Sequence, residues 1–144
     1  MWLLYSLLSA VIWGANYLFY EKILARISVS TLYFIDLTVG AIVFLFFALF
    51  NNAFTKDISL IQSSKSLQIL ILATVITSIL ANLFIALAIQ SKNATLSTLI
   101  EISYPVFIIL LGWLLFKENN LSLSVLIGGG LIFSGIAVIY MFSK

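Results

Sequence analysis

Two acidic residues, Asp36 and Glu101, lie inside long apolar stretches of this sequence. A charged side chain in the middle of a bilayer helix costs about 2.5–3.5 kcal/mol on insertion scales, so such a residue is a candidate for function. Poor solvation favours the neutral form of a carboxyl group, which therefore holds a proton more readily than it does in water. Asp36 and Glu101 could thus exchange a proton or bind an organic cation.

Polar and aromatic side chains recur every three or four residues near these carboxylates, which places them on one face of each helix. The rise of 1.5 Å per residue puts Asp36 roughly 6 Å and Glu101 roughly 7–8 Å inside the bilayer, from the same side. The spacing and the shared depth predict a water-filled pocket open to that side. Its candidate substrate- or proton-binding residues are Asp36, Glu101, Trp13, Tyr17, Asn82 and Tyr104.

Four of these residues, Asp36, Glu101, Trp13 and Asn82, also have a structural interpretation. Trp13 could serve ordinary packing, and Asn82 could hydrogen-bond a neighbouring helix. The acidic residues could be held in ion pairs near the membrane surface, Asp36 with Arg26 or Lys22 and Glu101 with Lys92. Glu21, beside Lys22, is expected to be interfacial and structural.

Five apolar stretches contain these residues, and each is close to the ~20 residues that a helix needs to cross the hydrocarbon core. The chain is 63% hydrophobic and 8% charged, whereas a soluble domain carries roughly 25% charged residues. We therefore expect one all-α transmembrane domain over residues 1–144, with its termini on opposite faces of the membrane. The expected spans are 2–20, 32–50, 67–89, 96–116 and 121–142.

The connections are short. Segment 51–66 is the longest and is expected to be a loop, with turns at Asn51-Asn52 and Ser63-Ser64. Tight turns are expected at 91–93 and 117–120. Lysine and arginine in such loops set the orientation of a membrane protein. The numbers of lysine and arginine residues on the two membrane faces are nearly equal here. This fits either insertion in both orientations or an orientation set by another factor.

The composition excludes several functions. The chain has no Cys and no His, so we expect no thiol chemistry, no His-ligated metal, no cofactor and no enzyme activity. A net charge of +2 without a basic cluster argues against nucleic acid as a partner.

Two further features concern helix geometry. Pro105 lies inside the fourth stretch and should kink it, either as a packing feature or as a hinge or pocket wall. The fifth stretch carries small residues that allow close helix approach, so we expect a packing or dimer face there. These residues are Gly128, Gly129, Gly130, Ser134 and Gly135.

The sequence resembles the EamA-type repeat of the drug/metabolite transporter superfamily. The resemblance is carried by Trp13, Gly14 and Asn16, by YPVF at 104–107, by LGWLLFKE at 111–118 and by LIGGGLIFSG at 126–135. It implies a single five-helix repeat, where most relatives have two. Two chains would then pair, as an antiparallel homodimer or with a homologous half, to rebuild the inverted symmetry of many transporters. Many relatives have an arginine early in the second helix, where this chain has Asp36, which favours a cationic substrate.

We therefore expect a secondary transporter of small organic molecules or metabolites, an exporter that works as a dimer and couples to protons. Its partners would be the substrate and the lipid bilayer, and its location the cell membrane, in a prokaryote the inner membrane. Two alternatives stay open: a non-transporting membrane subunit or scaffold, and a lipid-linked-sugar flippase.

Overall fold

The computed structural model describes residues 1–51, 54–117 and 122–142, and these segments contain helices and no strands. Five helical stretches are long and apolar enough to cross a membrane, which confirms the predicted all-α membrane fold. They are α1 (Trp2–Leu24), α2 (Val29–Phe50), α4 (Lys65–Ser91), a broken span (Ala94–Phe116) and α7 (Leu123–Phe142). The predicted turn at 118–120 and the predicted start of the last span at Leu121 lie outside the described residues.

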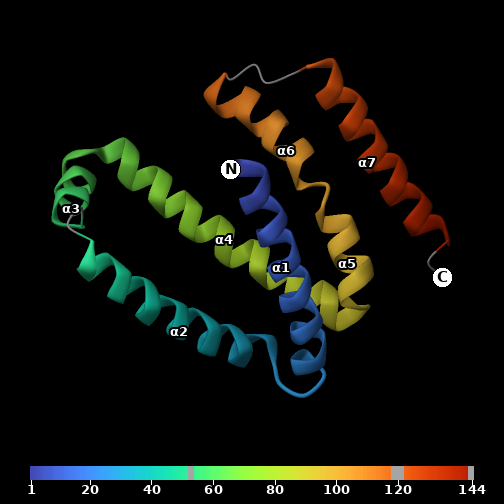
Figure 1. Cartoon of the computed structure of the whole chain (residues 1–144), viewed down its shortest axis with the longest axis horizontal. Coiled ribbons are helices and arrows are strands. Elements are labelled where there is room, and N and C mark those ends of the chain that lie inside the picture. Colours follow the sequence, from blue (N-terminus) through green and yellow to red (C-terminus); the bar gives the residue numbers. More distant parts are fainter. Residues whose placement is uncertain (52–53, 118–121, 143–144) are drawn as a thin grey trace.

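The fourth span consists of three pieces. Helix α5 (Ala94–Glu101) is followed by α6 (Tyr104–Leu111) and then by a short π-helix, η1 (Gly112–Phe116). Figure 1 shows the chain changing direction between α5 and α6. The kink predicted from Pro105 is thus an interruption of the helix.

The segment expected to be a loop between the second and third spans contains a helix, α3 (Phe54–Ser63). Phe54, Ile58 and Ile61 follow the spacing of one helical face, and Asp57 in the first turn suits the positive end of the helix dipole. The side-chain amide of Gln68 caps the C-terminal end of α3 by donating to the carbonyls of Ile61 and Gln62, at 2.9 and 3.2 Å. The expectation of a loop was therefore wrong.

Polar side chains fix where three of the helices begin. The hydroxyl oxygens of Ser28 and Ser64 accept hydrogen bonds from backbone N–H groups in the first turns of α2 and α4. The side chain of Asn93 does the same for α5. Such caps satisfy N–H groups that have no partner within the helix. The turns predicted at Ser63-Ser64 and at 91–93 are confirmed at these boundaries.

The buried core lies at one end of the molecule. There the end of α1, the start of α2, the end of α4 and the start of α5 meet, while α6 and α7 lie to one side (Figure 1). Most of the remaining apolar surface is not covered by the chain itself. The core consists of Tyr20, Leu24, Val29, Leu32, Tyr33, Ile85, Ala86, Ile89 and Ala94.

If all five candidate spans cross the membrane, their odd number should place the two termini on opposite sides. We expect a reporter fused before Met1 and a reporter fused after Lys144 to be accessible from opposite faces in each inserted molecule. If the chain inserts both ways, each fusion gives signal on both sides in equal proportion. Protease protection of the two fusions measures this, and two reporters confined to the same single face would contradict the five-span arrangement.

Candidate functional site

The carboxylate of Glu101 faces α1. The hydroxyl group of Tyr17 on α1 donates a hydrogen bond to Glu101 Oε1 at 3.1 Å. The ring of Tyr17 also packs on that of Trp13, with a centroid separation of 5.4 Å. The structure therefore brings together three of the residues that the sequence suggested: Trp13, Tyr17 and Glu101.

Pro105 explains why Glu101 lies at a helix end. A proline has no N–H, and its ring clashes with the carbonyl group four residues earlier. For Pro105 that residue is Glu101, which is the last residue of α5. The acidic side chain therefore projects from a break in the fourth span. In transporters, binding sites are often formed at such discontinuous helices.

The second carboxylate has a tyrosine partner that the sequence analysis missed. The hydroxyl group of Tyr20 donates to Asp36 Oδ2 at 2.8 Å. Tyr20 is buried, whereas Asp36 is exposed on the surface of this single chain. The available signal was spacing, because Tyr20 follows Tyr17 by three residues and so shares its face of α1.

A row of aromatic rings connects the two carboxylates. Tyr20 lies edge-on to Tyr17 at 6.4 Å and edge-on to Tyr33 at 5.8 Å, between ring centroids. The hydroxyl group of Tyr33 donates to the backbone carbonyl of Asn82 on α4 at 2.7 Å. The aromatic residues therefore link Glu101 on α5 to Asp36 on α2 through α1, and they tie α4 to the same cluster.

The ion pairs that the sequence allowed for Asp36 and Glu101 are not formed within the described residues. The salt bridge observed there joins Lys22 Nζ to Glu21 Oε1 at 3.3 Å. Phenol groups are neutral donors, so they stabilise Asp36 and Glu101 without cancelling their charge. No three metal-ligating side chains gather in the described parts of the chain. A carboxylate with a neutral hydrogen-bond donor can bind a proton or a cation.

Two of the suggested pocket residues lie apart from this hydrogen-bonded cluster. The side-chain amide of Asn82 donates to the carbonyl of Ser78 in its own helix at 2.9 Å, and it is the backbone carbonyl of Asn82 that accepts the hydrogen bond from Tyr33. Tyr104 begins α6 beyond the break and is 57% exposed. The sequence placed both residues on suitable faces, but the direction of each side chain is set by the packing of the helices.

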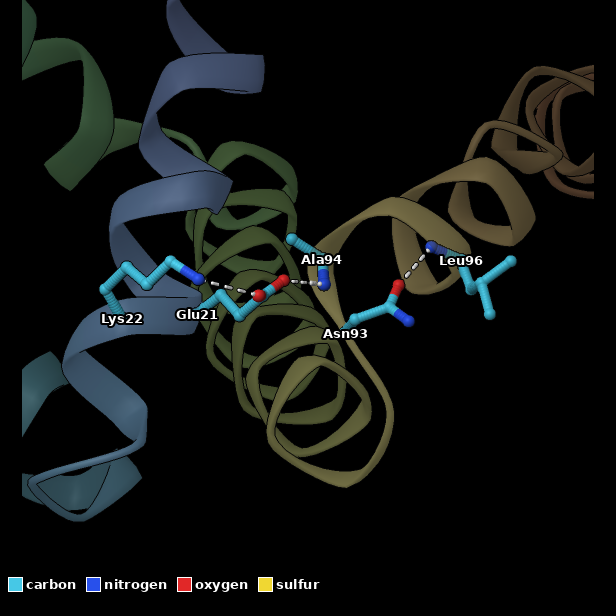
Figure 2. Close-up of polar contacts among 5 residues, drawn as sticks. All are labelled: Glu21, Lys22, Asn93, Ala94 and Leu96. Carbon is cyan, nitrogen blue, oxygen red and sulfur yellow. Dashed lines mark hydrogen bonds and ion pairs between the residues drawn. The ribbon is translucent and has the colours of Figure 1, made fainter.

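Glu21 holds the start of α5, as Figure 2 shows. Its Oε2 atom accepts a hydrogen bond from the backbone N–H of Ala94 at 2.7 Å, and its Oε1 atom meets Lys22. Tyr17 lies one turn earlier on α1 and bonds Glu101 at the other end of α5. Helix α1 thus contacts both the first and the last residue of α5, which fixes the position of the Glu101 carboxylate.

Substitution of Glu21 tests this attachment. Glu21→Ala should lower the thermal unfolding temperature of the purified protein, because the N–H of Ala94 loses its acceptor. Glu21→Gln loses the ion pair with Lys22 but keeps an oxygen acceptor, so it should unfold closer to wild type. Equal unfolding temperatures for the two variants would mean that the ion pair with Lys22, and not the hydrogen bond to Ala94, accounts for the stability that Glu21 contributes.

The small residues of α7 are mostly unpacked within the chain. A Cβ atom at Gly129 would meet Val106 of α6 at 3.4 Å, whereas one at Gly128, Gly130 or Gly135 would have no other described side chain within 4 Å. The hydroxyl group of Ser134 donates to the carbonyl of Gly130 in the same helix. One glycine therefore serves packing against α6, and the others are free for contacts outside the chain.

Comparisons with known proteins agree with this architecture. The sequence model of the EamA-like transporter family matches residues 1–141. Searches of curated proteins and of solved structures returned no match.

Proposed function

Because the chain belongs to the EamA-like transporter family, we propose that it is a secondary transporter of small organic molecules or metabolites. The five spans make it a multi-pass membrane protein, and the family is one of transporters and not of enzymes. We propose the cell membrane as its location, in a prokaryote the inner membrane, and export as the direction of transport.

The pairing of each carboxylate with a tyrosine is the observation that supports this proposal most. Asp36 and Glu101 lie in spanning helices with neutral hydrogen-bond donors and without a basic partner in the described structure. A carboxylate in this setting can accept either a proton or a cationic group of a substrate. Competition between the two for one site would couple their movements in opposite directions.

Reconstitution tests the proposal. Purified protein in liposomes with an imposed pH gradient should accumulate at least one compound from a panel of amines, amino acids and cationic dyes. Reversing the gradient should reverse the flux, and protein-free liposomes provide the baseline. Absence of gradient-driven flux across the whole panel would contradict proton-coupled transport of these classes. Flux of equal size with and without the pH gradient would contradict proton coupling but not transport itself.

We further propose that two copies of the chain, or this chain and a homologous half, form the working unit. Within the described residues the buried core lies at one end of the repeat, and three glycines of α7, Gly128, Gly130 and Gly135, have no described neighbour within 4 Å of a Cβ atom placed there. A second repeat of opposite orientation would cover such surfaces and rebuild the inverted symmetry of other transporters. The near balance of positive charge on the two faces is compatible with an antiparallel pair.

Gly130→Leu tests the pairing through α7. Because a side chain at Gly130 would have no atom of the described residues within 4 Å, the variant should fold as a monomer and lose the crosslinked dimer. Gly40 on α2 has equally open surroundings, so Gly40→Leu is the matched control and should keep the dimer. An unchanged dimer fraction for Gly130→Leu would place the interface elsewhere.

A further inference from the structure

Helix α3 joins two candidate spans, α2 and α4. The backbone N–H of Phe54 donates to the carbonyl of Asn51, the residue after α2, at 3.0 Å, and Ser64 alone separates α3 from α4. Ten helical residues extend about 15 Å, which is too short to cross a hydrocarbon core of ~30 Å. Figure 1 shows α3 at the end of α2 and α4 that is remote from the buried core. In a bilayer crossed by α2 and α4, α3 therefore lies at the membrane surface.

Hydrogen bonds hold α3 in one orientation on the start of α4. The carbonyl of Leu60 accepts from the backbone N–H of Ser64 at 3.1 Å and from the hydroxyl group of Ser63 at 2.9 Å. The carbonyl of Ile61 accepts from the side-chain amide of Gln68 on α4 at 2.9 Å. The end of α3 is thus attached to the first turn of α4, and the direction in which each face of α3 points is fixed by this attachment.

Helix α3 has one apolar face and one polar face. The apolar face consists of Phe54, Ile58 and Ile61, which follow the i, i+4, i+7 spacing, whereas Lys56 and Ser59 lie on the other side of the helix. The described chain covers the apolar face only in part, since Phe54 is 36% and Ile58 is 39% exposed. At a membrane surface, the bilayer is the apolar medium within reach of these side chains.

We infer that α3 is an interfacial anchor, whose axis follows the membrane surface and whose apolar face is inserted between the lipid headgroups and the acyl chains. Helices of this kind bury their apolar face about 5–10 Å into that boundary. The charges of Lys56 and Lys65 are partly offset by Asp57, so burial of apolar surface holds the helix, and attraction to anionic lipid does not. The anchor fixes the ends of α2 and α4 at which the described residues form no buried core. A second copy of the chain is the competing occupant of the apolar face.

The depth of single nitroxide labels tests the inference. The chain has no cysteine, so Ile58→Cys and Lys56→Cys each give one labelling site in the full chain, which is studied in nanodiscs. Collision rates with oxygen, which concentrates in lipid, and with a water-soluble nickel chelate report the depth, calibrated with spin-labelled lipids. We expect the label at position 58 about 5–10 Å below the phosphates. The label at position 56 should lie on the water side, about 10 Å away, which is the diameter of a helix.

A charge on the apolar face should detach α3 from the bilayer. With the label at Phe54→Cys, we expect Ile58→Lys to move the label toward water by about 5–10 Å, which is the depth that the apolar face would lose. Ser59→Lys is the matched control, because it adds the same charge one residue away on the polar face and should leave the depth unchanged. If Ile58→Lys does not fold, the depths at positions 56 and 58 still decide the question.

Equal access of the nickel chelate to the labels at positions 56 and 58 would overturn the inference, because α3 would then lie in water. A label at position 58 that is shielded from both reagents, with spin–spin broadening that disappears on dilution with unlabelled chain, would also overturn it and assign the apolar face to a second copy. Detachment at high salt would contradict it too, since salt screens charges and does not weaken apolar burial. Gradient-driven flux does not enter these measurements, so the transport proposal and this inference can fail independently.

Discussion

Glu101→Gln and Asp36→Asn should each fold as the wild type does and lower gradient-driven transport by about 10- to 100-fold. The size of the loss follows from the ~1.5–3 kcal/mol that a hydrogen bond to a charged group contributes. Each substitution keeps the size of the side chain and removes its charge, so proton exchange and cation binding are lost together. Liposome flux and thermal unfolding of the same preparations measure the two effects separately.

The hydrogen bonds explain why stability should be retained. Breaking a buried ion pair costs about 3–5 kcal/mol, but the partners of Asp36 and Glu101 are the neutral hydroxyl groups of Tyr20 and Tyr17. An amide oxygen can accept from either phenol. If neither variant folds, the two carboxylates are structural.

Asp57→Asn is the control for these variants. Asp57 is an exposed carboxylate in α3, between two spans, and its replacement should leave transport unchanged. Full gradient-driven transport by both Glu101→Gln and Asp36→Asn would place the site elsewhere. We expect the larger loss for Glu101, because it is half-buried and lies at the helix break.

Pro105→Ala should raise the unfolding temperature and lower transport by about tenfold or more. Pro105 stands in the first turn of α6, where a proline is tolerated, but it prevents α5 and α6 from joining. Alanine restores an N–H that can bond the carbonyl of Glu101 and so close a continuous helix. A continuous α5–α6 helix would turn the Glu101 side chain away from Tyr17, and a misplacement of about 1 Å can cost about 100-fold in activity.

The two readouts together distinguish the explanations for Pro105. A more stable protein with reduced flux would show that the break serves the site. A more stable protein with full flux would mean that Pro105 is a packing feature only. The conservative variant Ile102→Leu, which changes a side chain within the break but restores no N–H, should behave as the wild type in both measurements.

Much of the fold follows from the sequence alone. Length and hydropathy determine a membrane span because every backbone group in the hydrocarbon core must be satisfied within a helix or barrel. The five spans could be predicted for this reason. The turns at Ser63-Ser64 and 91–93 followed from their turn-forming residues, and the interruption near Pro105 followed from the missing N–H of proline. Helix α3 was missed because Asn51-Asn52 before it and Ser63-Ser64 at its end were read as turns, and because its apolar face is only three residues long.

The site could be predicted only in part. Helical period shows which residues share a face of one helix, and this placed Trp13, Tyr17 and Glu101 on suitable faces. It does not show how far one helix slides or rotates against another. The bonds from Tyr17 to Glu101, from Tyr20 to Asp36 and from Ala94 to Glu21 depend on that sliding and rotation. The residues in these pairs are 84, 16 and 73 positions apart, and only the packing of the helices at the core brings them together.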